Sequence, residues 1–262
     1  MDNILQKILD TVKNIIPQKT PESIIGIDIG ASAIKVVQLK KHNNKAILET
    51  YGSVSLGPYD NLQVGQLIDL TPDKLVTAIL DVLKASNVTT KNAVVSIPAV
   101  SSLIFLIEIP PMVKVTEFKD IVPTEARKYI PVPITEVSLD WWMIPRKDEL
   151  QEEIEGGVPV DPDHKTEVLV SAIHKDTVGK YQGIIRNSGL NSDLLEIEIF
   201  SSVRSTLGRE MSSVLVMDIG ASKTKLIIVE HGIVKGFHII DRGSADMSEA
   251  LSKSLDVTFA KA

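Results

Sequence analysis

The sequence contains no cysteine. A chain without thiols has no disulfide scaffold, no thiol nucleophile and no cysteine-ligated zinc or iron–sulfur site. Aromatic residues make up only 4% of the chain, so the stacking platforms that bind single-stranded nucleic acids are not expected. The net charge of −6 provides no excess of cations for a phosphate backbone. We therefore expect no nucleic-acid partner.

The sequence also lacks a long hydrophobic run. No apolar stretch reaches the roughly 18 residues that a membrane-spanning helix needs. Near the N-terminus, Asp2, Lys7 and Asp10 interrupt the apolar residues and no small-residue cleavage site follows, which argues against a signal peptide. We expect a cytoplasmic chain. Its 262 residues, 44% hydrophobic and 24% charged, predict a globular protein of about two domains.

The N-terminal segment has the pattern of an amphipathic helix, predicted over residues 1–17 and ended by Pro17. Its apolar positions recur at three- and four-residue spacing: Ile4, Leu5, Ile8, Leu9, Val12, Ile15 and Ile16. This helix either packs on its own domain or lies on a partner or membrane surface. Its polar face carries as many acids as bases, which favours a partner over anionic lipid. A second biased segment, residues 147–165, is rich in acids and predicts a solvated loop between two strands.

An internal repeat is the strongest signal in the sequence. Residues 24–39 (hairpin 1) and residues 214–229 (hairpin 2) both contain Asp-Ile-Gly-Ala-Ser-x-x-Lys, at 28–35 and at 218–225. In each copy an apolar strand ends near the Asp, a Gly-Ala-Ser turn follows, and a second apolar strand begins, which is typical of a β-hairpin. Two matched segments of this length predict two similar subdomains that face each other.

The two hairpins have the chemistry of a polyphosphate clamp. Glycine lets backbone N–H groups approach a phosphate closely, and an Asp carboxylate can hold a hydrated Mg²⁺ that binds phosphate in turn. Neither the Gly-x-x-x-x-Gly-Lys-Ser/Thr loop nor the Gly-x-Gly-x-x-Gly dinucleotide motif occurs. The candidate phosphate contacts are Gly30, Ala31, Ser32, Lys35, Gly220, Ala221, Ser222 and Thr224. The candidate ligands of Mg²⁺, acting through water, are Asp28 and Asp218. For Lys35 a solvated strand position is an equally good interpretation.

These hairpins resemble the phosphate-1 and phosphate-2 motifs of the actin-like ATPase superfamily. Within it the sequence resembles the family of the type IV pilus assembly protein PilM and, more distantly, the cell-division protein FtsA. The resemblance extends over nearly all of the chain after residue 22. Among the segments that carry it are Val-Val-Ser-Ile-Pro at 94–98, Ile-Pro-Pro-Met at 109–112 and Ser-Gly-Leu at 188–190.

The resemblance implies an α/β fold of actin-like (ribonuclease H-like) lobes with an inserted small βαββ subdomain of the SHS2 type. It implies a first lobe at residues 23–100 and 175–209, the insert at residues 101–174, and the start of a second lobe at residues 210–262. A complete member would add a Gly-rich adenosine-binding segment after this point, and none precedes Ala262. We therefore expect a C-terminally incomplete chain.

The periodicity of the sequence predicts the elements of these lobes. The expected strands are residues 24–29, 34–40, 46–55, 93–97, 103–109, 137–144, 168–173 and 194–199, besides hairpin 2. The expected helices are residues 72–85, 116–129 with a kink or break at Pro123, 177–187, a helix after Phe200, and 244–255. Along 72–85 the apolar face is predicted to contain Leu75, Val76, Ile79, Leu80 and Leu83.

The resemblance also points to catalytic candidates. Glu196 and Glu198 lie where the family has its first hinge and its water-orienting residue, and we expect only one of them to face the cleft. No second catalytic Asp of the sugar-kinase type is found, so phosphate transfer to a sugar would lack its general base. On the predicted strand 137–144, Trp141 and Trp142 must point to opposite sides. The outward Trp either packs under the acidic loop or anchors a partner.

The function implied by the resemblance is that of a cytoplasmic, ATP-binding component of the type IV pilus inner-membrane assembly platform. ATP and Mg²⁺ are its implied cofactors, and the activity is at most that of a weak ATPase. The implied partners are the N-terminal tail of the membrane protein PilN and other pilus platform proteins, which would hold the chain at the cytoplasmic face of the inner membrane. The alternatives are a scaffold without nucleotide, like the cytoplasmic domain of a type II secretion platform protein, and an FtsA-like division protein.

Overall fold

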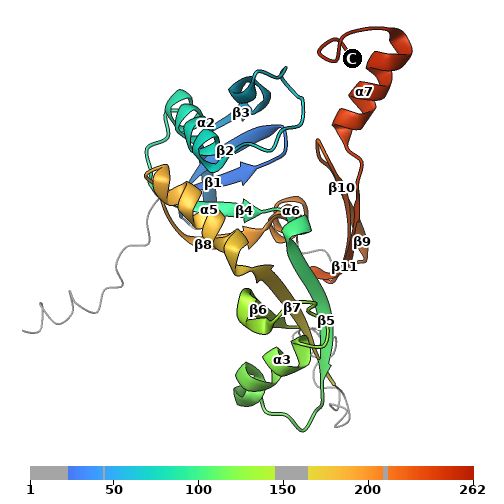
Figure 1. Cartoon of the computed structure of the whole chain (residues 1–262). Helices are drawn as coiled ribbons and strands as arrows, with labels where there is room; N and C mark the ends of the chain where they lie inside the picture. The colour runs from blue at the N-terminus through green and yellow to red at the C-terminus, as the bar shows by residue number, and fades with distance from the viewer. Residues whose placement is uncertain (1–22, 44, 145–164, 209–211) are drawn as a thin grey trace, which may run out of the picture.

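A computed structural model describes residues 23–43, 45–144, 165–208 and 212–262 of the chain. In this part of the chain the strands form three separate sheets, of which one has five strands and two have three strands (Figure 1). No helix in the described part is long and apolar enough to cross a bilayer. The predicted N-terminal helix and nearly all of the predicted acidic loop lie outside the described residues.

The five-stranded sheet has the order β3-β2-β1-β4-β8. β1 (Ser23–Ile29), β2 (Ala33–His42) and β3 (Lys45–Ser55) correspond to the first three predicted strands and form an antiparallel meander. β4 (Asn92–Ile97) runs parallel to β1, and β8 (Asn191–Ile197) runs parallel to β4. The carboxyl ends of β1, β4 and β8 therefore meet at one edge of the sheet, which is where α/β proteins bind ligands.

Two helices cover one face of this sheet, α2 (Pro72–Ala85) and α5 (Lys175–Asn187) (Figure 1). The predicted bounds of α2 are confirmed, but its predicted apolar face is wrong at Leu80, which is 47% exposed. Leu80 lies about 100° around the helix from the buried Ile79, beyond the stripe that meets the sheet. Ala78 and Val82 are buried in its place.

The second sheet lies within residues 101–174, the segment predicted to be an insert and called the insert below, and has the order β5-β7-β6, with antiparallel pairs. Its elements follow the predicted strand–helix–strand–strand order: β5 (Ser102–Ile109), α3 (Phe118–Ala126), β6 (Val137–Met143) and β7 (Thr166–His174). Helix α3 packs on this sheet in a core of its own around Phe118, Val122 and Val170.

Helix α3 is shorter than the predicted residues 116–129 at both ends. It begins at Phe118, after a 3-10 turn at Val115–Glu117, and it ends at Ala126, where the next residues make turns such as Lys128 N to Glu125 O at 3.1 Å. Pro123 lies inside the helix, as predicted, and does not end it, although a proline has no N–H to donate to the preceding turn. Tyr129 follows the helix and its ring stacks on Phe105, with 5.0 Å between the centroids.

The third sheet, β11-β10-β9, consists of β9 (Val214–Ile219), β10 (Thr224–Glu230) and β11 (Ile233–Ile240). Helix α7 (Ser244–Leu255) follows it with the predicted bounds. One face of this sheet packs on helix α6 (Glu198–Thr206), which begins directly after β8. Ile227 and Val229 of β10 and Ile199 of α6 are the buried centre of that contact.

The predicted strand 194–199 is corrected at its end. β8 stops at Ile197, and Glu198 is the first residue of α6 rather than a strand residue. Glu196 lies in β8 and Glu198 in α6, so the two predicted catalytic glutamates do not share one strand. The in-and-out prediction for the tryptophans is confirmed, because Trp141 packs on the core of the insert and Trp142 is 52% exposed.

Candidate functional site

The Asp and the Lys of the shared motif lie opposite each other in both hairpins. Asp28 of β1 pairs with Lys35 of β2, and Asp218 of β9 pairs with Lys225 of β10. In each case the Asp is the last residue but one of its strand. The predicted repeat is therefore a repeat in three dimensions, with its charged residues in the same register.

The turns of the two hairpins have nearly identical geometry. Gly30 N donates to Ala33 O at 3.0 Å, and Gly220 N donates to Lys223 O at 2.9 Å. A Cβ atom on either glycine would lie 3.1 or 3.0 Å from the same carbonyl oxygen, closer than ordinary van der Waals contact. The tight turn therefore favours glycine in both copies, and it places the following Ala and Ser at the tip.

The turn of hairpin 1 is held from outside by the loop after β3. Leu56 N donates to Ser32 O at 2.8 Å, and Ile68 N donates to Ala31 O at 3.1 Å. Both carbonyls are used on this side, so the turn has a fixed orientation. The Ser32 side chain is half-buried.

The turn of hairpin 2 is held by the N-terminal end of α7. Ser244 N donates to Gly220 O at 2.9 Å, and Ala245 N donates to Ala221 O at 3.0 Å. The contact is close enough that a Cβ atom on Gly243 would lie 2.3 Å from Ala221 O. The positive end of the α7 dipole therefore lies beside this turn, an arrangement that favours an anion there.

Asp28 has one fixed partner and one loose partner. Ser96 Oγ, at the end of β4, donates to Asp28 Oδ1 at 2.9 Å. Lys35 Nζ lies 3.4 Å from Asp28 Oδ2, and both side chains are substantially exposed. The Asp28 carboxylate thus has a defined orientation at the sheet edge and one oxygen accessible to a hydrated cation.

Asp218 lies in a tighter arrangement. Lys225 Nζ donates to Asp218 Oδ2 at 2.8 Å and to Glu198 Oε2 at 2.7 Å. Burial, the largest influence, would lower the pKa of Lys225, but the hydrogen bonds to the two carboxylates together with their charges raise it overall. The other oxygen, Glu198 Oε1, accepts a bond from Ala99 N at 2.8 Å. Glu198 therefore joins the end of β8 to hairpin 2.

Glu196 has a different partner. Both of its carboxylate oxygens bind the guanidinium of Arg204 on α6, one of them at 2.6 Å from Nη1. This bidentate bond raises the pKa of Arg204. Glu196 lies in register with Ser96, and Ser96 with Asp28, across three parallel strands. Glu198 is thus the glutamate that contacts hairpin 2, whereas Glu196 lies in the row of Asp28.

The sequence did not indicate two further residues at this site, Tyr181 and Asp69. Burial raises the pKa of Tyr181 on α5 to about 12, and the charges of Glu198, Asp28 and Asp69 add to the shift. The charges of all three carboxylates therefore act on one phenol. Nothing in the local sequence around Asp69 or Tyr181 marks them, because they belong to a loop and a helix that only the fold brings to this edge.

The remaining predicted residues are less directly placed. The hydroxyl of Thr224 donates to Arg242 O at 2.8 Å, so it binds the backbone just after β11. The side chain of Ser222 is half-buried at its turn. In the described part of the chain, no group of three His, Asp or Glu side chains lies close enough together to hold a metal ion. Any Mg²⁺ at this edge would complete its ligand shell with water and phosphate.

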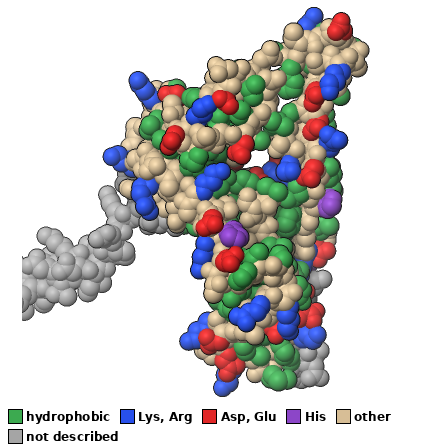
Figure 2. Space-filling model, viewed as in Figure 1, with side chains coloured by type: hydrophobic (Ala, Val, Ile, Leu, Met, Phe, Trp, Pro, Cys, Tyr) green, Lys and Arg blue, Asp and Glu red, His purple; other side chains and the backbone are tan. Residues whose placement is uncertain are grey.

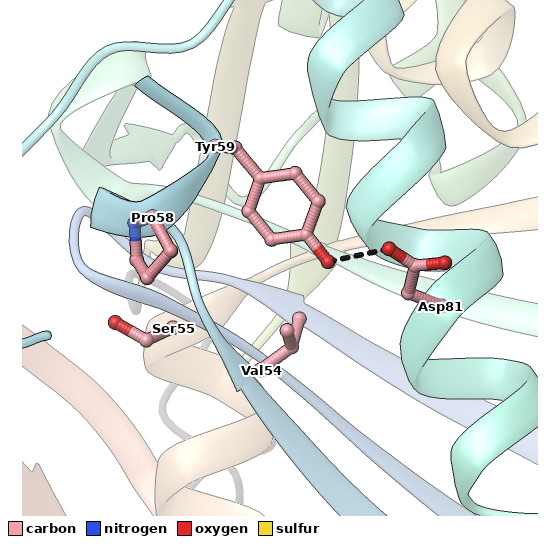
Figure 3. A pocket seen from close by; sticks show the side chains of 5 residues that line it. All are labelled: Val54, Ser55, Pro58, Tyr59 and Asp81. Carbon is pink, nitrogen blue, oxygen red and sulfur yellow. Dashed lines mark hydrogen bonds between the residues drawn. The ribbon is translucent and has the colours of Figure 1, made fainter. Parts of the chain in front are cut away.

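A hollow separates the five-stranded sheet from the part built on β9–β11 and α7, as Figure 2 shows. A shallow pocket of about 300 Å³ lies between the end of β3, the turn that follows it and α2 (Figure 3). It is lined by Val54, Ser55, Pro58, Tyr59 and Asp81. Tyr59 Oη donates to Asp81 at 2.7 Å, and burial together with this bond raises the pKa of Tyr59 to about 12. Its phenol is therefore neutral and occupied.

The comparison with known families decides the relationship. A family model of the type IV pilus assembly protein PilM matches residues 26–235. The chain belongs to the PilM family. The match includes all of hairpin 2, hairpin 1 from residue 26 onward, and residues 101–174, so the PilM-like segments of the sequence are confirmed as a family relationship.

Solved structures agree on the fold. A PilM–PilN type IV pilus biogenesis complex superposes with a TM-score of 0.71 and 24% identity, over 91% of this chain and 67% of that chain. The cytoplasmic domain of EpsL, an inner-membrane component of the type II secretion system of Vibrio cholerae, superposes with a TM-score of 0.52 and 10% identity, over 88% of this chain and 74% of that chain. The predicted α/β fold of the actin-like ATPases is confirmed.

Proposed function

We propose that this PilM-family chain binds ATP with Mg²⁺ between its two hairpins and serves as a nucleotide-responsive component of the type IV pilus assembly platform. The observation that supports this is the matched geometry of the hairpins: both present an oriented carboxylate beside a tight Gly-Ala-Ser turn. A single such turn has many structural uses, but two copies, one in each of the parts that flank the hollow, support a phosphate clamp.

In this proposal the residues have distinct roles. The turns formed by Gly30, Ala31 and Ser32 and by Gly220, Ala221 and Ser222 offer N–H groups and hydroxyls to the phosphates. Asp28 and Asp218 hold the water shell of Mg²⁺, and Lys35 and Lys225 supply positive charge. Bound Mg²⁺ would neutralise the phosphates and link the two hairpins.

We propose at most a slow ATPase activity. Glu198 is the better placed candidate for orienting a water molecule, because it lies against hairpin 2. However, its oxygens bind Lys225 and the Ala99 N–H, and those of Glu196 bind Arg204. Neither carboxylate is free to act as a base in this state. The same observation supports the second candidate, a scaffold without nucleotide, which the ATP titration below would identify.

Nucleotide binding is tested by titrating the protein with a fluorescent ATP analogue in the presence of Mg²⁺. We expect saturable binding, and we expect Asp28→Asn and Asp218→Asn each to weaken it about tenfold, or about 1.4 kcal/mol. Asp176→Asn is the matched control, because the Asp176 side chain is 98% exposed and lies on another element. If the unmodified chain does not bind ATP, the result supports the scaffold without nucleotide. If both hairpin variants bind ATP as tightly as the unmodified chain, the result contradicts the proposed phosphate clamp.

We also propose that the chain binds the N-terminal cytoplasmic tail of a PilN-type membrane protein and is thereby held, with other platform proteins, at the cytoplasmic face of the inner membrane. The similar PilM structure is a complex with PilN. On this chain, β6 is an edge strand of the insert sheet and carries the exposed Trp142. An edge strand can accept an extended peptide, and an exposed Trp is a frequent anchor of such contacts.

This partner is tested with a labelled peptide of the PilN tail from the same source, by fluorescence anisotropy. We expect Trp142→Ala to weaken binding about 30-fold, as for a hot-spot residue of about 2 kcal/mol. Met247→Ala is the control, because the Met247 side chain is apolar, is 59% exposed and lies on α7, away from β6. No binding by the unmodified chain would contradict the partner, and equal loss in both variants would contradict the role of Trp142.

A further inference from the structure

The two hairpins differ in the surroundings of the lysine that ends their shared motif. Lys35 is 63% exposed, and its ammonium lies 3.4 Å from the carboxylate of Asp28. Lys225 is only 12% exposed and lies 2.8 Å from the carboxylate of Asp218 and 2.7 Å from that of Glu198. One lysine of the repeat is thus a loose surface partner, whereas the other bridges two carboxylates.

This bridge connects elements that are far apart in the sequence. Lys225 and Asp218 belong to hairpin 2, whereas Glu198 begins α6, directly after β8. Two residues along β10 from Lys225, the buried Ile227 packs in the core between the third sheet and α6. The polar contact of Lys225 with Asp218 and Glu198 therefore lies next to this apolar contact. The hydrogen bond from Ala99 N to Glu198 Oε1 fixes the orientation of the Glu198 carboxylate.

The low exposure of this bridge gives it weight. Exposed ion pairs contribute little, but charge-assisted hydrogen bonds shielded from water are stronger, and removal of one member leaves like or unpaired charges behind. Without the Lys225 ammonium, Asp218 and Glu198 would face each other as two carboxylates. Paired carboxylates are the ligands that Mg²⁺ and Mn²⁺ prefer. The ammonium and a divalent cation thus need the same oxygens.

We infer that Lys225 is a positioning residue whose ammonium occupies the place between Asp218 and Glu198 that a divalent cation would take. It holds hairpin 2 against the N-terminal end of α6. A cation that enters with a nucleotide must displace it from at least one carboxylate, and the released ammonium is then available to the phosphates. This last step rests on the proposed nucleotide binding, but the bridge itself does not.

The inference is tested with Mn²⁺ alone, by electron paramagnetic resonance of the free ion. We expect Lys225→Met to bind Mn²⁺ at least about tenfold more tightly than the unmodified chain, because both carboxylates become available. Lys225→Arg keeps a positive charge between the two carboxylates and should bind Mn²⁺ as weakly as the unmodified chain. Lys35→Met is the matched control and should not gain binding, because in the described part of the chain Lys35 bridges Asp28 to no second carboxylate. Equal Mn²⁺ affinity of Lys225→Met and the unmodified chain would overturn the inference.

A measurement on the unmodified chain covers the case in which Lys225→Met does not fold. In NMR spectra of isotope-labelled lysine side chains, the Lys225 ammonium should exchange its protons with water at least about tenfold more slowly than Lys35, since its protons are bound and shielded. The substitution Glu198→Gln should speed that exchange. Equally fast exchange at the two lysines would overturn the bridge. A chain that passes these tests but binds no ATP would refute the proposed function alone.

Discussion

The substitution Ile227→Ala is expected to lower the free energy of unfolding by about 4 kcal/mol. Ile227 is fully buried on β10, in the core that joins the third sheet to α6. Loss of its side chain leaves a cavity at the contact between two elements that are not covalent neighbours, and the surrounding groups relax only in part. Urea denaturation measures the change, and hydrogen exchange should show it first in β9, β10 and β11.

The neighbouring residue provides a control of the same chemistry. Ile228 lies next to Ile227 on β10 but points to the other side of the sheet, where it is 50% exposed. Ile228→Ala should therefore cost less than about 1 kcal/mol. Equal effects of the two substitutions would mean that the face of β10 directed at α6 is not the packed face.

The substitution Gly243→Ala is expected to displace the first turn of α7 and to destabilise the chain by about 3 kcal/mol. The added Cβ atom would lie 2.3 Å from Ala221 O and 2.6 Å from Gly220 O. These are backbone atoms of the turn of hairpin 2, which cannot rotate away as a side chain would. The hydrogen bond from Ser244 N to Gly220 O would lengthen or break. Thermal unfolding measures the loss.

The matched control is Gly236→Ala, because a Cβ atom there meets nothing within 4 Å. It lies on β11 of the same sheet and should change stability by less than about 1 kcal/mol. If the proposed clamp is correct, Gly243→Ala should also weaken ATP binding while Gly236→Ala leaves it unchanged. A fully stable Gly243→Ala variant would contradict the close approach of α7 to the turn.

Much of the local structure could be predicted from sequence periodicity. Alternating apolar residues predicted the strands β1, β2 and β3, and a helical repeat that begins at Pro72 predicted α2. The errors in the predicted bounds lie where the sequence does not mark the end of one element or the start of the next. Residues 194–199 read as one apolar strand, because nothing in Glu-Ile-Glu-Ile marks the start of a helix at Glu198. The predicted helix 116–129 likewise ran past Ala126, because the local sequence does not mark the end of α3.

The candidate site divides in the same way. Asp28, Asp218 and the glycines of the turns were identified from the repeat alone, because a hairpin and its turn are defined by adjacent residues. Asp69 and Tyr181 were missed, since a loop before α2 and a helix after β7 reach the sheet edge only through the fold. Whether these residues bind a nucleotide stays a prediction for the titrations above.

The sequence by itself determined the two hairpins, their register and the glycine in each turn, because these depend on backbone bonds between neighbours in the chain. Only the tertiary structure decided what the repeated lysine does. Lys35 and Lys225 occupy the same position of the same motif, yet the first remains exposed while the second is shielded between two carboxylates. The physical reason is that hairpin 2 packs on α6, which brings Glu198 to its lysine, whereas the lysine of hairpin 1 pairs with its own Asp28 at the surface.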